Sequence, residues 1–289
     1  MKYLRKLFRG LSGISLVSVI TLFRSGPGDA RRVISSTLLS YSGNEKRKMS
    51  TWDMVRGFAV NDEIKLFGGH WTDGCISALE RYIMAQLIKY FKPDIIVEIG
   101  TFRGSTTRVI LDNMEPTSRV YTVDLPADYR SSQKDFLSDE RLIKHRKVGA
   151  DYADHPLSGN VVQILGDTFE PATWEKLPDN IDFVFIDASH SYEAVHNDTD
   201  KIRPKLKNNA VVLWHDYTEG ESMDRGVGKY IREMMKKHSD VFVCENTSFA
   251  IRIPENELKA ASKRIPSFFP DGSYAIRHPD GATPWLNDK

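Results

Sequence analysis

Short apolar runs alternate with amphipathic stretches along most of the chain. Five runs have the length and the β-branched and aromatic content of buried strands. They cover residues 94–99, 119–124, 161–165, 181–186 and 210–214. Apolar residues with helical spacing lie around and between them and predict helices over 75–91, 104–114, 192–205 and 226–237. This alternation predicts an α/β fold whose parallel sheet is covered by helices on both faces.

Two further apolar runs follow, at residues 241–244 and 249–253, and the polar residues 245–248 between them favour a hairpin. The sequence therefore predicts a doubly wound, seven-stranded, mostly parallel sheet with a terminal antiparallel hairpin. Its parallel connections are expected to be right-handed. The long polar segment 126–158 is expected to carry function or to lie over the site.

The first 28 residues contain basic side chains and no acid. Their apolar residues recur at helical spacing, which predicts a basic amphipathic helix, and the apolar stretch is too short to span a bilayer. Three interpretations stay open: an arm that docks or supports oligomerisation, a helix on a membrane surface, and a cleavable targeting segment. We therefore divide the chain into an arm and linker (1–50), a ligand-binding domain (51–254) and a polar tail (255–289) that is expected to wrap the surface.

Composition adds little to the prediction of fold and function. A net charge of +1 gives no reason to expect a nucleic-acid partner. The two cysteines, Cys75 and Cys244, are too few for a disulfide framework and match no metal motif. We expect a cytoplasmic protein that could contact a membrane peripherally through its arm.

Acidic residues gather where the predicted strands end. The first four strands are each closed or followed by one, and the fifth is followed by a histidine and an acid. These residues are Glu98, Asp124, Asp167, Asp187 and the pair His215-Asp216. Since ligands bind outside the carboxyl ends of the strands in such sheets, this edge is the predicted site.

The turn after the first strand is the predicted cofactor cradle. Gly100 and Gly104 permit a tight turn and close approach of a ligand, and the helix that follows offers free N–H groups. Asp124 follows Gly100 by 24 residues, near the spacing of an acid that binds ribose hydroxyls. The middle glycine of a dinucleotide turn is missing, and Glu98 suits a cofactor with a positive charge and an amino group. The turn therefore favours S-adenosylmethionine over a nicotinamide dinucleotide.

Three segments carry a resemblance to a known family. Val-Glu-Ile-Gly-Thr-Phe-Arg-Gly-Ser-Thr-Thr (97–107), Phe-Ile-Asp-Ala-Ser-His-Ser-Tyr-Glu (185–193) and Trp-His-Asp-Tyr (214–217) resemble class I S-adenosylmethionine-dependent methyltransferases. More narrowly, they resemble the bacterial group that includes macrocin-type sugar O-methyltransferases and cephalosporin hydroxylase-like proteins. The resemblance covers about residues 75–253 and implies a Rossmann-like methyltransferase fold.

The resemblance implies a role for each residue of the predicted cofactor site. Asp124 would bind the ribose, Asp167 would lie beside the adenine, and Asp187 would lie near the reacting methyl group. The methionine part and the ribose would be held by the turn and the start of the helix, namely Glu98, Gly100, Thr101, Gly104 and Ser105.

The resemblance also implies a metal site with two departures. In the metal-dependent sugar methyltransferases, an acid after the fourth strand and two acids after the fifth hold magnesium; here the positions are Asp187 and His215-Asp216. In this chain a histidine, His215, replaces one of the two acids after the fifth strand. Ser189 stands where the family has a suggested general base. Asp187 and Asp216 remain candidate ligands of a divalent ion, although imidazole shifts the preference away from magnesium. His215 and His190 are the candidate bases, because imidazole titrates near neutral pH.

We expect methyl transfer to a hydroxyl of a sugar, a glycan or a secondary metabolite. Two alternatives remain: a non-catalytic or differently reacting protein of the same fold that docks by its basic arm, and a nicotinamide oxidoreductase.

Overall fold

The computed structural model describes residues 48–49, 51–66, 74–129, 147–218, 226–262 and 285–288 of the 289-residue chain. The predicted arm, residues 1–28, lies outside these ranges, as does the middle of the long segment 126–158.

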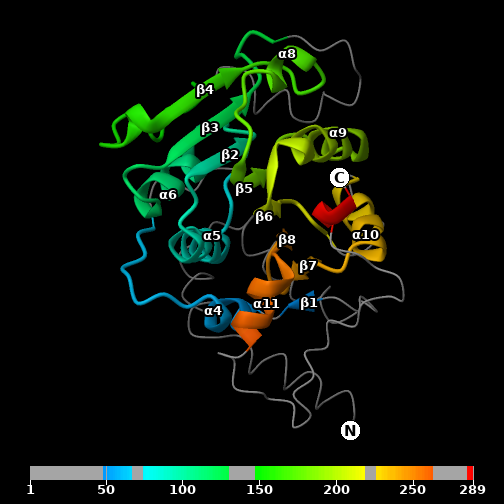
Figure 1. The fold of residues 1–289 in the computed structure, drawn as a ribbon. Coiled ribbons are helices and arrows are strands. Elements are labelled where there is room, and N and C mark those ends of the chain that lie inside the picture. Colours follow the sequence, from blue (N-terminus) through cyan, green and yellow to red (C-terminus); the bar gives the residue numbers. More distant parts are fainter. Residues whose placement is uncertain are drawn as a thin grey trace, which may run out of the picture.

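An eight-stranded sheet runs through the described part of the chain in the order β1-β7-β8-β6-β5-β2-β3-β4 (Figure 1). The seven predicted strands are confirmed, and only β8 among them runs antiparallel to its neighbours. They are β2 (Ile95–Ile99), β3 (Arg119–Asp124), β4 (Val161–Leu165), β5 (Ile181–Ile186), β6 (Leu206–Trp214), β7 (Val241–Cys244) and β8 (Ala250–Arg252).

The eighth strand, β1 (Lys48–Met49), was not predicted and lies within the expected linker. It pairs in parallel with β7, where Met49 stands opposite Cys244, and the Glu245 amide donates to the Met49 carbonyl at 2.9 Å. Two residues are too few to produce a readable alternation of apolar and polar positions.

The four predicted helices are confirmed with small differences at their ends. They are α5 (Ala78–Phe91), α6 (Ser105–Asn113), α9 (Tyr192–Ile202) and α10 (Val227–Lys237). The sequence did not predict three short helices, α4 (Thr51–Gly57), α8 (Pro171–Trp174) and α11 (Glu255–Ser262). It also did not predict the 3-10 turns η2 (Ser158–Asn160) and η4 (Trp285–Asp288). A further 3-10 turn, η3 (Arg203–Lys205), continues α9. Elements of one or two turns carry too few apolar positions to define a period.

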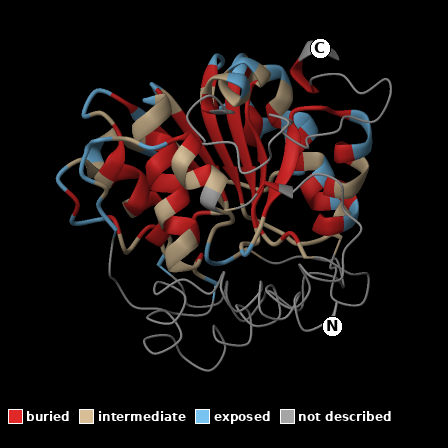
Figure 2. Cartoon of the chain, turned by 90° about the horizontal axis from the view of Figure 1, so that it is seen from below, coloured by how far each residue is buried: buried red, intermediate tan, exposed pale blue. Residues whose placement is uncertain are grey.

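Apolar cores cover both faces of the sheet (Figure 2). On one face Phe183 and Phe185 pack with residues of α5 and α6, and on the other Val184 and Ile186 pack with residues of α9 and α10. Because the central strands are buried on both faces, they appear in the sequence as continuous apolar runs instead of alternating ones.

The end of the chain differs from the expected surface tail. Trp285 and Leu286 of η4 are buried, and the Trp285 ring meets the Trp214 ring edge to face at 5.8 Å. The Trp285 amide donates to Asp240 Oδ1 at 2.9 Å. Only tertiary contact distinguishes this apolar pair from the polar sequence around it.

The chain reverses its direction of winding between β2 and β5. From β2 it proceeds outward to β3 and β4, whereas from β5 it proceeds the other way to β6. The carboxyl ends of β2 and β5 therefore flank the crevice in which doubly wound sheets bind ligands. Among the helices that the structure describes, none is long and apolar enough to cross a membrane.

Candidate active site

Gly100 joins the two sides of the crevice. Its φ is 100°, and a Cβ atom at this position would lie 2.0 Å from the carbonyl oxygen of Asp187. Its amide donates to the Val123 carbonyl at 2.8 Å, and the Asp187 amide donates to the Ile99 carbonyl at 2.8 Å. The predicted cofactor turn and the end of β5 are therefore in direct backbone contact, which only glycine permits at this position.

Gly104 begins α6 in the left-handed conformation, with a φ of 85°. A Cβ atom there would lie 2.4 Å from the ring of Tyr152. The same segment bonds the turn through its backbone, because the Gly149 amide donates to the Phe102 carbonyl at 3.1 Å and the Asp151 amide to the Arg103 carbonyl at 2.7 Å. Residues 149–152, near the end of the long segment 126–158, thus hold the glycine turn in place. Residues 130–146 of the same segment lie outside the described part.

Backbone amide groups hold Asp124, the last residue of β3, and Asp167, which follows β4. Asp124 accepts from the Phe102 amide at 2.5 Å and from the Leu125 amide at 2.6 Å. Asp167 accepts from the Phe169 amide at 2.9 Å and from the Tyr129 hydroxyl. This hydrogen bond and partial burial raise the pKa of Tyr129 to about 12. A carboxylate oxygen has two lone pairs and can accept more than one hydrogen bond, so carboxylates of this kind suit the hydroxyl and amino groups of a ligand.

Glu98 lies inside the sheet, where its Oε2 accepts a hydrogen bond from the Thr107 hydroxyl. Burial raises the pKa of Glu98 well above its usual range. Its Oε1, and the Oγ of Ser105, are buried without a hydrogen-bond partner within the described residues. Because buried polar atoms are rarely left unsatisfied, these two atoms fit a site that binds polar ligand groups.

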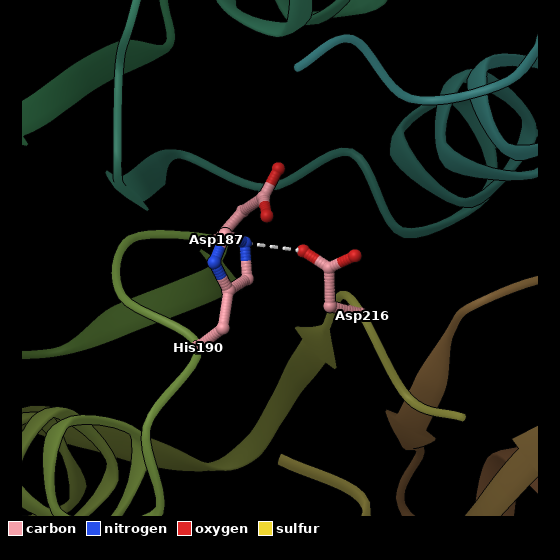
Figure 3. A group of neighbouring side chains, drawn as sticks. All are labelled: Asp187, His190 and Asp216. Carbon is pink, nitrogen blue, oxygen red and sulfur yellow. Dashed lines mark ion pairs between the residues drawn. The ribbon is translucent and has the colours of Figure 1, made fainter. Parts of the chain in front are cut away.

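Asp187, His190 and Asp216 converge on the other side of the crevice (Figure 3). Asp187 and His190 follow β5, and Asp216 follows β6 with a φ of 58°. His190 Nε2 lies 2.6 Å from Asp216 Oδ2, and the His190 side chain is 20% exposed. One ligand atom from each of the three residues lies within 4.8 Å of the other two, close enough to hold a metal ion.

His215 is enclosed by carboxylates at both ring nitrogens. Its Nδ1 lies 3.1 Å from Asp187 and 3.3 Å from Asp216, and its Nε2 lies 3.6 Å from Glu80. Burial alone would lower the pKa of His215, but the three acids raise it well above its usual range. Both ring nitrogens already face carboxylates, and this surrounding disfavours the predicted role of His215 as a base.

Glu80 belongs to this cluster and was not predicted from the sequence. Burial would raise the pKa of Glu80, but attraction to His215 and hydrogen bonds lower it to about 2. The sequence signal was the capping box of Ser77 and Glu80 at the start of α5. That pattern indicates a helix start and does not by itself point to a site.

The predicted site residues thus form two groups. The residues predicted to bind the cofactor lie at the ends of β2, β3 and β4, and the histidines and acids of the proposed reaction side follow β5 and β6. The structure brings Asp187, His190, His215 and Asp216 together and places the glycine turn against Asp187. The Gly-Gly-His-Trp stretch at residues 68–71, a further candidate from the sequence for part of the entrance to the site, lies outside the described residues.

Comparison with protein families gives one match. Residues 97–217 match the family model described as a methyltransferase domain. The match begins within β2 and ends directly after Asp216, so it includes the glycine turn, Asp124, Asp167 and the polar residues that follow β5 and β6, but not Glu80.

Comparison with curated protein sequences gives no match. Among solved structures, the chain is similar to the O-methyltransferase TomG of Streptomyces achromogenes in complex with S-adenosylmethionine, at 18% identity and a TM-score of 0.45, over 70% of this chain and 86% of that one. It is also similar to the methyltransferase PaMTH1 of Podospora anserina bound to S-adenosylhomocysteine, at 15% identity and a TM-score of 0.49, over 84% and 96% of the two chains. Similarity at this level says nothing about the acceptor.

Proposed function

We propose that the protein is an S-adenosylmethionine-dependent methyltransferase that acts on a hydroxyl of a sugar, a glycan or a secondary metabolite. One observation carries the proposal: the stretch that matches a methyltransferase domain is the stretch that the topology gathers at the reversal between β2 and β5. The resemblance to the macrocin-type group supports the choice of acceptor class.

The cofactor would lie along the glycine turn. Gly100, Thr101, Gly104 and Ser105 would line the methionine part and the ribose, with Glu98 beneath them. Asp124 would accept from the ribose hydroxyls and Asp167 would lie beside the adenine. When bound, S-adenosylmethionine supplies an electrophilic methyl group on a sulfonium. The turn's contact with Asp187 would bring that group to the end of β5.

His190 is our proposed base. It is the more exposed of the two imidazoles, at 20% against 7% for His215, and its contact with Asp216 would stabilise the imidazolium that forms when it takes the hydroxyl proton. The bound cofactor would supply the methyl group: the acceptor oxygen would bond to the methyl carbon as the carbon–sulfur bond breaks, with S-adenosylhomocysteine as the leaving group. Asp187 and His215 would hold the arrangement and exclude water.

Asp187, His190 and Asp216 also fit a divalent metal ion by donor type and spacing. Two carboxylates and one imidazole suit manganese, iron or zinc better than magnesium. His215 does not fit as a ligand, because carboxylates already face both of its ring nitrogens. If a metal is required, His190 would be its nitrogen ligand and the metal would lower the pKa of the acceptor hydroxyl.

Calorimetry of the purified chain with S-adenosylmethionine and, separately, with NAD tests the cofactor. We expect binding of the first only; binding of NAD alone would favour the oxidoreductase alternative. Turnover to S-adenosylhomocysteine is then measured with methyl glycosides, nucleotide sugars and phenols. Cofactor binding without turnover on any acceptor would favour the non-catalytic alternative, and loss of turnover with a chelator would favour the metal.

A further inference from the structure

We propose that Glu80 is a positioning residue of the reaction side, which fixes the His215 ring from the start of α5. The effect on turnover rests on the proposed methyl transfer, whereas the contact itself can be tested without it.

Backbone groups from two distant elements fix the Glu80 carboxylate. Its Oε1 accepts from the Ser248 amide at 2.6 Å, and its Oε2 accepts from the Ser77 amide at 2.7 Å. Ser248 lies between β7 and β8, and the Glu80 residue is only 4% exposed. A carboxylate held at both oxygens has little freedom to move, so it offers His215 a fixed negative charge.

The His215 ring depends on that charge for its orientation. Phe185 and Phe249 meet the ring at 6.2 Å and 5.8 Å between centroids and restrict its plane. Within this slot a half turn about the Cβ–Cγ bond would still put ring carbons in the places of the two nitrogens. The ion pair between Nε2 and Glu80 favours the orientation in which Nδ1 faces Asp187 and Asp216.

The contact extends to His190, the more exposed imidazole of the cluster. Asp216 is shared between His215 and His190, so the chain of contacts runs from Glu80 through His215 and Asp216 to His190. A displaced His215 ring would release Asp216 and alter the position of His190. Glu80 itself is only 4% exposed and lies 3.6 Å from the His215 ring, so it would act through that ring.

Helix capping alone does not account for this arrangement. Ser77 Oγ accepts from the Glu80 amide at 3.3 Å, so S77A removes this cap bond. The same change leaves the Ser77 amide, the Ser248 amide and His215 in place around the carboxylate. E80Q removes the negative charge and keeps the size of the side chain. The two variants therefore separate capping from positioning.

Histidine-ring spectra by ¹H–¹⁵N NMR test the contact, with His215 assigned by its loss in H215N. We expect E80Q to shift the His215 and His190 ring signals and S77A to leave both in place. Unchanged His215 signals in E80Q would overturn the proposal, and so would an equal shift in S77A. Circular dichroism melting checks that both variants fold.

Turnover gives the second measurement, on whichever acceptor is methylated in the assay above. We expect E80Q to lower kcat about tenfold or more, as misplaced reacting groups do, with the affinity for S-adenosylmethionine unchanged. S77A should retain the kcat of the natural protein. A normal kcat in E80Q would overturn the effect on catalysis. If the natural protein methylates no acceptor, the proposed function fails, while the ring spectra still decide the role of Glu80.

Discussion

On one side of the crevice, backbone amide groups hold the acids, and on the other side imidazole rings hold them. Asp124 and Asp167 each accept from amides of their own loops or of the glycine turn. Asp187 and Asp216 are paired with His215 and His190 instead. On the first side, backbone hydrogen bonds fix the positions of the acids. On the second side, the position and charge of each group depend on the charges of the others.

The difference determines how each side responds to a change. On the cofactor side, a substitution that leaves the backbone in place is expected to affect only the contacts of the substituted residue. On the reaction side, removing one charge leaves its buried partners uncompensated, so effects spread through the cluster and do not add.

The largest effect is expected where the two sides touch. G100A would place a Cβ atom 2.0 Å from the Asp187 carbonyl at a residue with a φ of 100°. We expect a loss of about 3 kcal/mol or more in the free energy of unfolding, because backbone must move on both sides. Chemical denaturation measures it, and calorimetry should show no binding of S-adenosylmethionine. G159A is the matched control, since a Cβ atom there meets nothing within 4 Å. Equal stability of the two variants would contradict the contact between the sides.

A change on the reaction side should act on turnover alone. H190Q removes the proposed base, and we expect kcat to fall by about 10² to 10⁴ with cofactor affinity unchanged. Steady-state kinetics and calorimetry measure the two quantities. H196Q is the control, because that histidine is half exposed on α9 and pairs only with Asp200 among the acids of the described residues. Full turnover in H190Q would remove His190 as the base.

A change on the cofactor side should do the opposite. D124A removes the acceptor of the Phe102 and Leu125 amides as well as the proposed ribose contact. We expect cofactor affinity to fall at least about a hundredfold, or about 3 kcal/mol, in calorimetry. D94N, at the exposed opposite end of β2, is the control. Wild-type affinity in D124A would rule out its role in binding.

The smallest expected effect is a dependence of stability on pH. The pKa of Glu80 is about 2 in the folded chain against an ordinary value of 4.5, so its contribution to stability is complete above 4.5 and is lost as the pH falls toward 2. Linkage gives a loss of about 2 kcal/mol between about pH 7 and pH 3. Denaturation of the natural protein and E80Q across this range should show their difference shrinking as the pH falls. A constant difference would contradict the lowered pKa of Glu80 in the folded chain.

Most of the sheet could be predicted because its strands are long and buried on both faces. Runs such as residues 181–186 are apolar except for Asp182, and the acids that follow the strands mark one edge. The same approach missed β1 and η4, whose residues join the core through contacts with β7 and Trp214 instead of through a repeating pattern.

The cofactor side was more readable than the reaction side. A glycine turn and the acid that holds it depend on local backbone conformation, which a short segment of sequence specifies. The sequence also marked Asp187, His190, His215 and Asp216 as candidates, but it left open which histidine would be a base.

The sequence by itself determined the order of the strands along the chain, the glycine turn and the set of polar residues at the strand ends. Only the tertiary structure decided what those residues do to one another. It brought Glu80 from the helix that precedes β2 to the ring of His215, and it left His190 as the more exposed imidazole. The physical reason is that propensity and hydrophobic period act over a few residues, whereas the pKa of a buried group depends on every charge packed around it.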